Sequence, residues 1–383
     1  MPAFTRTPAV VLSIALAAAA AATPAAAAPA SLWDHPGYDA EDSYYNPAES
    51  VINAGSIAKL GKKWSVNLRK SDASCSGPSA PVLAGGRLFA TDHLGISSYA
   101  AADGKLGWRF DWADIMDNEV PRLAVSDGLL IAANGDCNSQ SDPDGQLTAI
   151  DVVTGKQRWQ LPLDMPIYSA VVDKGVVVVT GWSQSDEEAV VAYRARDGRQ
   201  LWRKVNHSTT GVSANGVLLI HKTDGYGEPA GDTAAVDIGT GATRWTRKGG
   251  WTAQAASPRA DRFYVTSQDR SLVAIDAATG KAVWTAAGKE SALVAADGTR
   301  VYRTEGRGVE ALDARTGKRA WITQLGVEAT QPVRAGGLLY AGGAVLNASD
   351  GTVAGPVFGG RVVVTGGLLY QVLGNLLVTY GVR

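Results

Sequence analysis

The first candidate for chemistry is an acidic loop between residues 134 and 145. Asp136, Asn138, Asp142 and Asp144 place oxygen-bearing side chains at alternating positions, as calcium-binding loops do. The segment lacks the central glycine and the closing bidentate glutamate of an EF-hand, and Pro143 stiffens it. The sequence therefore favours an Asx-rich turn, in which these side chains bond turn amides, with a calcium site as the alternative.

The histidines and serines show no pattern of a catalytic or zinc site. The histidines are His35, His93, His207 and His221, and none has a second histidine or a cysteine at ligand spacing. The nucleophile elbow Gly-x-Ser-x-Gly is absent from the sequence. From these residue types we predict no catalytic residue and no metal site.

One short pattern recurs along the chain and must build the scaffold that positions any such loop. Residues 149–159, 235–245, 274–284 and 311–321 all fit Ala-x-Asp-x-x-Thr-Gly-x-x-x-Trp. The Asp, Gly and Trp of these copies are Asp151, Gly155 and Trp159; Asp237, Gly241 and Trp245; Asp276, Gly280 and Trp284; and Asp313, Gly317 and Trp321. Looser copies keep only the Gly and Trp, and a copy at 345–355 keeps Gly351 but has Gly355 in place of Trp.

Each copy predicts a β-hairpin. An apolar strand ends near the Asp, Thr-Gly makes the turn, and the return strand carries the Trp. Glycine supplies the positive φ that a tight turn needs, and the Asp and Thr side chains can bond the turn amides. Because the Trp follows the glycine at a fixed spacing, it can wedge against the neighbouring copy and donate its N–H to a carbonyl. We expect the repeated tryptophans to pack sheet against sheet rather than to stack on a cofactor.

The length of the repeat predicts a β-propeller. The tryptophans of this series are Trp64, Trp108, Trp159, Trp202, Trp245, Trp284 and Trp321. They are 44, 51, 43, 43, 39 and 37 residues apart, which is the length of one four-stranded blade. Trp64 lies on an orphan outer strand, and three strands at 361–380 lack one, so pairing of the two chain ends would close the ring. We predict an all-β, eight-bladed propeller of four-stranded antiparallel sheets, with seven blades as the alternative.

The start of the chain predicts export. Residues 1–30 contain Arg6, an apolar run and Ala28-Pro29-Ala30, and they resemble a secretory signal peptide cleaved after Ala30. A membrane anchor is the alternative, but the run is too short and too rich in alanine to span about 30 Å of hydrocarbon. No cysteine lies near the cleavage site to carry a lipid. We expect residues 31–60 to form an arm lying over a propeller of residues 61–383.

The two cysteines, Cys75 and Cys137, are expected on the same face of adjacent blades. Cys75 precedes the first strand of one unit, and Cys137 lies in the acidic loop of the next. In an exported protein this placement favours a disulfide, with two free thiols as the alternative. The disulfide would pin the acidic loop to its neighbour, which is a structural role.

Long loops on one face mark the expected binding region. If the strands of a blade are named A to D from the channel outward, the B–C loops and the D–A connections share one face. Binding sites are usually carried by loops on a rigid scaffold, so we expect Trp182, Tyr226 and Trp251 to contact a ligand there; solvated loops without function are the alternative. The long B–C insertions are Asn134–Gly145, Trp182–Glu188 and Thr223–Asp232.

The repeat resembles the tryptophan-docking motif of the PQQ-like (pyrroloquinoline quinone) β-propeller family over nearly all of residues 44–383. The resemblance implies the propeller fold. Family members that are alcohol or sugar dehydrogenases bind PQQ and calcium in the channel, and many have a disulfide of adjacent cysteines. This chain has no adjacent cysteine pair, and no residue aligns with the calcium ligands or the catalytic base. Other relatives, such as the outer-membrane assembly lipoprotein BamB, use the ring only to hold partners.

These observations predict an exported, non-enzymatic propeller that binds a protein or a cell-envelope glycan through its loops. No cofactor and no membrane span are expected. The net charge is −1 and neither sign clusters, so the sequence does not indicate nucleic acid or an anionic membrane as a partner. The alternative is a PQQ- and calcium-dependent quinoprotein dehydrogenase of alcohols or sugars.

Overall fold

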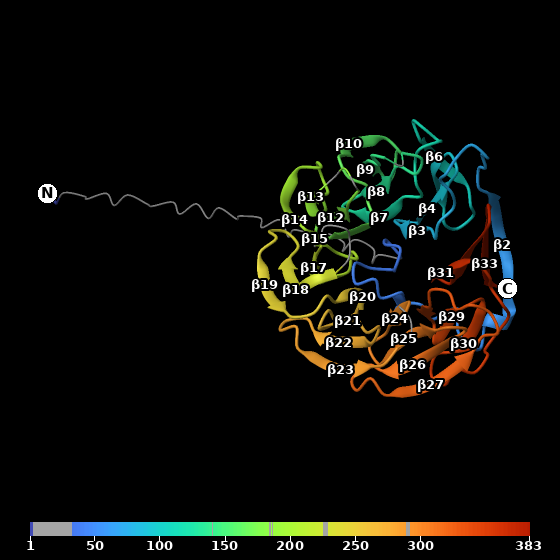
Figure 1. Cartoon of the computed structure of the whole chain (residues 1–383). Coiled ribbons are helices and arrows are strands. Elements are labelled where there is room, and N and C mark those ends of the chain that lie inside the picture. Colours follow the sequence, from blue (N-terminus) through green and yellow to red (C-terminus); the bar gives the residue numbers. More distant parts are fainter. Residues whose placement is uncertain (3–32, 140, 184, 186, 225–228, 289–291) are drawn as a thin grey trace. The chain divides into compact units, whose positions relative to one another are not determined.

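The computed structural model describes residues 1–2, 33–139, 141–183, 185, 187–224, 229–288 and 292–383. By its internal contacts the chain divides into Met1–Ala30 and Ser31–Arg383; residues 3–30 of the expected signal peptide lie outside the described residues. The described part of the second unit forms eight sheets arranged as the blades of a ring (Figure 1). This confirms the eight-bladed propeller over the seven-bladed alternative. Among the described residues, no helix is long and apolar enough to cross a membrane.

Most blades run in chain order from an inner strand at the channel to an outer strand. Blade 1 contains β3 (Val82–Ala84), β4 (Arg87–Asp92), β5 (Gly95–Ala100) and β6 (Leu106–Asp111). Blade 2 contains β7 (Arg122–Ser126), β8 (Leu129–Gly135), β9 (Gly145–Asp151) and β10 (Gln157–Leu163). Blade 3 contains β11 (Ser169–Asp173), β12 (Val176–Gly181), β13 (Ala189–Arg194) and β14 (Gln200–Val205).

The next three blades follow the same plan, with the inner strand of blade 4 split in two. Blade 4 contains β15 (His207–Ser208), β16 (Ser213–Ala214), β17 (Val217–Thr223), β18 (Pro229–Asp237) and β19 (Thr243–Arg247). Blade 5 contains β20 (Thr252–Ala256), β21 (Arg262–Thr266), β22 (Leu272–Asp276) and β23 (Ala282–Ala286). Blade 6 contains β24 (Val294–Ala296), β25 (Arg300–Glu305), β26 (Gly308–Asp313) and β27 (Arg319–Gln324).

Blade 8 closes the ring with both ends of the propeller chain. β31 (Arg361–Thr365), β32 (Leu368–Leu373) and β33 (Leu376–Val382) supply its three inner strands. β2 (Leu60–Asn67) pairs antiparallel with β33 as the outer strand, and Trp64 lies opposite Thr379. The closure predicted from the orphan strand at Trp64 is confirmed.

The docking of each tryptophan on the next blade is well illustrated by Trp284. Its Nε1 donates a 2.9 Å hydrogen bond to the carbonyl of Ala314, which follows Asp313 in the C–D turn of blade 6. Asp313 Oδ1 accepts 2.8 Å bonds from the amide and hydroxyl of Thr316 and so shapes that turn. Gly317 has a φ of +70°, and a Cβ there would lie 2.7 Å from the Trp284 ring. The glycine is therefore required both by the turn and by the ring packed on it.

The same donor and acceptor pair recurs at six other blade interfaces. In each case the indole N–H of one blade reaches the carbonyl that follows the Asp position, or its equivalent, in the next blade. The acceptors are Ala101 for Trp64, Val152 for Trp108, Ala195 for Trp159, Ile238 for Trp202, Ala277 for Trp245 and Ala348 for Trp321.

Blade 7 departs from the predicted four-stranded repeat at its outer edge. β28 (Val333–Ala335), β29 (Leu338–Ala341) and β30 (Ala344–Asn347) are followed, among the described residues, by a single bridge between Leu346 and Val353. The fourth strand lies instead on the inner side, where β1 (Tyr45–Asn46) pairs in parallel with β28.

The missing tryptophan of blade 7 has a structural reason. It would have to dock on the C–D turn of blade 8, but that turn is split between the chain end at Arg383 and the residues before β2. The buried Ile57 of the 3₁₀ helix η1 (Ile57–Lys59) fills the space instead. A Cβ at Gly355 would lie 2.8 Å from the Ile57 side chain. Glycine at 355 thus makes room for a residue that replaces the indole.

Residues 33–46 of the N-terminal arm lie inside the ring (Figure 1), whereas Glu49 and Val51 lie against the A–B turn of blade 8. Residues 33–46 contact the inner strand of every blade in turn, which corrects the predicted position of the arm. Six blades pair with it through backbone bonds: Leu83 with Trp33, Val125 with Asp34, Ser213 with Ala40, Ala256 with Glu41, Ala296 with Ser43 and Arg334 with Tyr44. Side chains complete the circuit in blades 3 and 8, through His35 to the carbonyl of Val172 and Asn46 to that of Val364.

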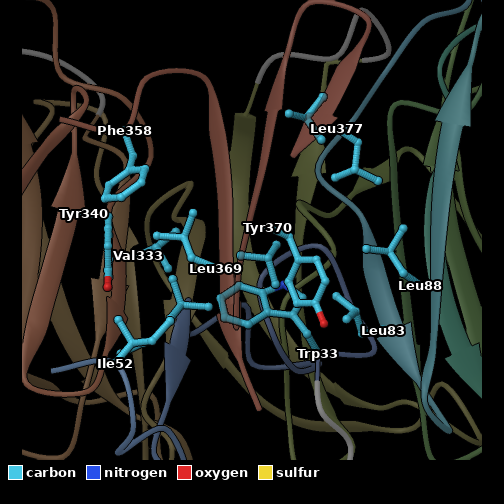
Figure 2. Packing of buried hydrophobic residues seen from close by; sticks show 14 of the residues in the cluster. Trp33, Ile52, Leu83, Leu88, Val333, Tyr340, Phe358, Leu369, Tyr370 and Leu377 are labelled. Atoms are coloured by element: carbon cyan, nitrogen blue, oxygen red, sulfur yellow. The ribbon is translucent and has the colours of Figure 1, made fainter. Parts of the chain in front are cut away.

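The arm forms a floor at one end of the channel. Its partners lie near the ends of the inner strands, next to the A–B turns, so the channel stays open toward the B–C loops. Trp33 is fully buried against Leu83 and Tyr370 in the same core cluster as Ile52 and Tyr340 (Figure 2). Sequence reasoning missed this role because backbone pairing leaves no side-chain pattern.

Candidate functional site

The face that carries the B–C loops and D–A connections, called the loop face from here on, holds the predicted insertions. In blade 2 the loop proper spans residues 136–144, because Asn134 and Gly145 belong to strands. In blade 3 it spans 182–188. In blade 4 β17 and β18 extend into the third insertion and leave only residues 224–228 between them. Tyr226 lies outside the described residues.

The disulfide between Cys75 and Cys137 is confirmed, with 6.4 Å between the Cα atoms. Asp117, in the connection from blade 1 to blade 2, holds the same loop. Its carboxylate accepts bonds from the amides of Cys137 and Asn138 at 2.8 and 2.6 Å and from the Ser139 hydroxyl at 2.7 Å. Burial opposes its charged form, but these hydrogen bonds outweigh burial and lower the pKa of Asp117. The loop is thus fixed at two points, one in the connection before blade 1 and one in the connection after it.

The four calcium candidates do not converge. Asp136 accepts a bond from the amide of Asp144 at 3.2 Å, whereas the Asn138 side chain donates to the Met116 carbonyl. Asp142 accepts a bond from the Ser185 hydroxyl in the insertion of blade 3. Within the described residues, no group of three acidic, histidine or cysteine side chains could hold a metal ion. These bonds are those of an Asx-rich turn that is hydrogen-bonded to the insertion of blade 3.

Loss of the disulfide is expected to destabilise the protein. The Cys75→Ser/Cys137→Ser double variant should unfold with a free energy about 2–4 kcal/mol lower, because the bridge spans 62 residues of unfolded chain. Denaturant unfolding of both proteins under non-reducing conditions measures this. Equal midpoints and slopes would show that Asp117 alone fixes the loop.

The aromatic residues predicted to contact a ligand lie in different surroundings. Trp182 is half-buried in the blade 3 insertion on the loop face. Trp251 packs against the hydrophobic core between blades 4 and 5, and its amide is bonded to the Thr233 hydroxyl at 2.8 Å. Two exposed apolar side chains near the rim were not singled out from the sequence: Met116 and Tyr168, with 57% and 50% of their surface exposed.

A cavity of about 170 Å³ lies in the channel between the arm and blades 2 to 4. The arm lines it with His35, Asp39, Asp42 and Tyr44, and Arg122 of β7 lines it from the wall. The hydroxyl and amide of Ser43 donate 3.0 and 3.1 Å bonds to Asp39. Sequence reasoning did not select these carboxyls because only the fold places them in the channel.

Burial dominates the electrostatics of this cavity. It raises the pKa of Asp42 to about 7, and burial together with the nearby charge of Glu41 raises the pKa of Asp39 to about 7. Burial lowers the pKa of His35, but the hydrogen bond and charge of Asp34 outweigh it and raise that pKa overall. Burial also lowers the pKa of Arg122. The cavity therefore favours neutral carboxyls and resists added negative charge.

Stability should fall as the pH rises from about 5 to 8. An Asp whose folded pKa is raised from about 3.9 to about 7 holds an extra proton in the folded state between those values, so folding weakens as pH rises through that window. The raised pKa of His35 acts in the same direction. Asp42→Asn should be more stable than the wild type at pH 8 by at least about 1.4 kcal/mol, the value of one pKa unit, because burial raises this pKa by about three such units.

Denaturant unfolding at both pH values tests this. The left-handed φ of 51° at Asp42 suits asparagine, so the substitution adds no backbone strain. The docking-turn carboxylates Asp151, Asp237 and Asp313 have lowered pKa values and lose their contribution only at more acidic pH. A wild type that is more stable at pH 8 than at pH 5 would contradict the assignment of Asp39 and Asp42.

The channel residues do not fit PQQ and calcium. PQQ is a tricarboxylate, and among the described residues that line this cavity it would meet the half-buried carboxyls of Asp39 and Asp42 and a single guanidinium, that of Arg122. Calcium takes six to eight oxygen ligands, but Asp39 is bonded to Ser43. Among the described residues, no three acidic, histidine or cysteine side chains are placed to hold a metal ion. The arm also occupies the end of the channel near the A–B turns. We therefore derive no reaction step through a quinone.

Comparison with known proteins agrees with this geometry at the level of the fold. The quinohemoprotein alcohol dehydrogenase of Comamonas testosteroni is 13% identical with a TM-score of 0.67, covering 92% of this chain and 80% of that chain. BamB of Moraxella catarrhalis is 19% identical with a TM-score of 0.60, covering 84% and 99%. A europium-containing methanol dehydrogenase is 13% identical with a TM-score of 0.64, covering 90% of each.

Comparison with curated protein sequences finds no match. Residues 92–250 and 229–366 match the family model described as outer membrane protein assembly factor BamB. The two matches overlap and together span well over half of the sequence. The docking turns and the tryptophans on them lie largely within these residues. The chain therefore belongs to the BamB-type, PQQ-like β-propeller family.

Proposed function

We propose that this chain is an exported, non-catalytic propeller that holds a protein of the cell envelope through its loop face. We call the B–C insertions of blades 2 to 4, at 134–145, 182–188 and 223–232, the rim. The observation that supports the proposal is that bonds join parts of the rim to each other and to neighbouring connections. The insertion of blade 2 is joined to the connections on either side of blade 1 by the disulfide and by Asp117, and to the insertion of blade 3 by the bond between Asp142 and Ser185. Loops fixed at this many points form a preorganised surface, which lowers the entropic cost of binding.

The composition of the rim suits a protein partner. Exposed Met116 lies beside Asn138, and exposed Tyr168 lies near Glu119 and Glu188. Protein interfaces favour methionine and aromatic residues surrounded by polar groups. The channel offers less to a ligand, because the arm forms its floor. The disulfide supports an oxidising location outside the cytoplasm, as the predicted signal peptide requires.

The experiment is cross-linking of the immobilised protein to solubilised envelope proteins of its own source, followed by identification of the captured chains. Trp182→Ala/Tyr226→Ala should lose the captured partner and keep its thermal unfolding midpoint. Val153→Ala is the matched control, because Val153 is 62% exposed in a C–D turn on the opposite face.

Two results would contradict the proposal. Capture that is unchanged in the double variant would remove the rim as the contact surface. Retention on isolated envelope polysaccharide, with no protein captured, would make the partner a glycan.

A further inference from the structure

A second cavity on the loop face lies between blades 7 and 8, opposite the polar rim. Its volume is about 220 Å³. Four aromatic side chains line it, from three separate parts of the chain: Trp33, Tyr44, Tyr340 and Phe358. Figure 2 shows Tyr340 and Phe358 at one side of the shared core and Trp33 near its middle. We call this cavity the aromatic pocket.

Among the described residues that line the aromatic pocket, Arg361 at the start of β31 has the one charged side chain, and it is exposed to solvent. Its Nη1 donates a 3.2 Å bond to the carbonyl of Pro78. Within the described part of the chain no carboxylate lies within ion-pair distance of it, although ion pairs are common elsewhere in the ring. The guanidinium therefore has donors left for an anion, and a planar guanidinium suits a carboxylate in particular.

Two exposed apolar side chains lie next to glycines that line the pocket. Val357 is 76% exposed, and Leu373 is 57% exposed. Both lie beside glycines: a Cβ at Gly343 would be 3.2 Å from Val357, and one at Gly360 would be 3.4 Å from the backbone of Leu373. Exposed apolar groups gathered at a cavity mark contact surfaces.

The walls are held in place before any ligand arrives. The amide of Phe358 donates a 2.8 Å bond to the carbonyl of Gly343, which fixes the connection between blades 7 and 8 across the B–C turn of blade 7. Gln371 Nε2 bonds the carbonyl of Gly359 at 2.7 Å. A preformed pocket needs little reorganisation on binding.

We propose that the aromatic pocket receives an apolar anchor side chain of the partner protein, with an adjacent acidic residue bound by Arg361. This inference rests on the proposed function and names the chemistry that the loop face recognises. The apolar anchor is inferred from the aromatic walls and from the exposed Val357 and Leu373 beside them. The acidic part follows from a cation without a carboxylate partner in an otherwise uncharged lining. Buried aromatic anchors next to an arginine are typical of the residues that dominate interface energy.

The test uses the purified protein and blocked peptides, with binding measured by calorimetry and by tryptophan fluorescence, since Trp33 lines the pocket. Acetyl-Ala-Glu-Phe-Ala-amide should bind at least about tenfold more tightly than the same peptide with Lys for Glu or with Ala for Phe. Arg361→Gln should lower the affinity for the Glu-Phe peptide about tenfold. Arg259→Gln, an exposed arginine in an A–B turn on the opposite face, is the matched control and should bind as the wild type does.

A second variant protects the test against misfolding. Val357→Asp changes a side chain that is 76% exposed, so the fold should be unaffected. The variant should bind the Glu-Phe peptide more weakly than the wild type does and the Lys-Phe peptide more tightly. Equal binding of both peptides by the wild type would overturn the inference. So would free 3-phenylpropionate binding as tightly as the Glu-Phe peptide, because the pocket would then serve a small acid.

The experiments distinguish a wrong aromatic pocket from a wrong contact surface at the rim. If the peptides show no preference while capture of the envelope partner still depends on Trp182 and Tyr226, only the aromatic pocket is wrong. The Glu-Phe peptide could bind through Arg361 while the Trp182→Ala/Tyr226→Ala variant still captures the envelope partner. In that case the aromatic pocket is supported and the rim is not the contact surface.

Discussion

Trp284→Ala is expected to lower the free energy of unfolding by about 3–5 kcal/mol, the usual cost of emptying a buried aromatic site. The indole is 8% exposed and packs on Tyr264, with 6.0 Å between ring centroids. The variant would lose this packing, the hydrogen bond to the Ala314 carbonyl, and the contact with Gly317 of the next blade. Denaturant unfolding with the disulfide intact measures the change.

Val283→Ala is the matched control for this substitution. Val283 precedes Trp284 on the same outer strand, but it is 44% exposed, so its truncation should cost about 0.5 kcal/mol or less. A similar small loss for Trp284→Ala would mean that the tryptophans do not join the blades.

Removal of the arm is expected to be at least as costly. A chain that begins at Tyr45 loses Trp33, which is fully buried, and the backbone bonds that join residues 33–44 to six blades. A buried tryptophan alone is worth about 3–5 kcal/mol, and each backbone bond adds about 0.5–1.5 kcal/mol. We therefore expect a loss of about 5 kcal/mol or more in the free energy of unfolding. Trp33→Ala provides a milder version with a loss of about 3–5 kcal/mol.

The comparison of truncated and full-length protein by denaturant unfolding and limited proteolysis checks the arm. Inner strands that lose their partner should become cleavable near their A–B turns. If the truncated chain unfolds within about 1 kcal/mol of the full-length protein, the arm would be an accessory and not the floor of the channel.

The parts of the structure that a repeat encodes were predictable from the sequence. The Asp, Gly and Trp positions repeat because each docking turn must satisfy the same geometry, so one copy explains the others. Trp64 predicted the ring closure because it occupied the outer position of a blade whose other strands were missing. Cys75 and Cys137 could be paired because the strand order placed both on one face.

The parts that depend on single, unrepeated contacts were not predictable. The arm pairs through its carbonyls, which every residue has, so residues 33–46 show no pattern of a channel floor. Asp39 and Asp42 look like ordinary surface carboxyls until the fold buries them. Arg361 became a candidate only when the structure showed that no described carboxylate faces it. The exception is Gly355, whose missing tryptophan adjoins the split turn of blade 8 and could have indicated Ile57 as its substitute.

The central claim is that the channel of this propeller is built around its own arm and that the protein recognises a partner instead of oxidising a substrate. The most direct measurement is the absorption spectrum of the purified protein after incubation with PQQ and calcium and removal of free quinone, followed by dye-linked oxidation of alcohols and aldoses. We expect no quinone absorbance to remain with the protein and no turnover. Stoichiometric quinone absorbance together with turnover would contradict the claim.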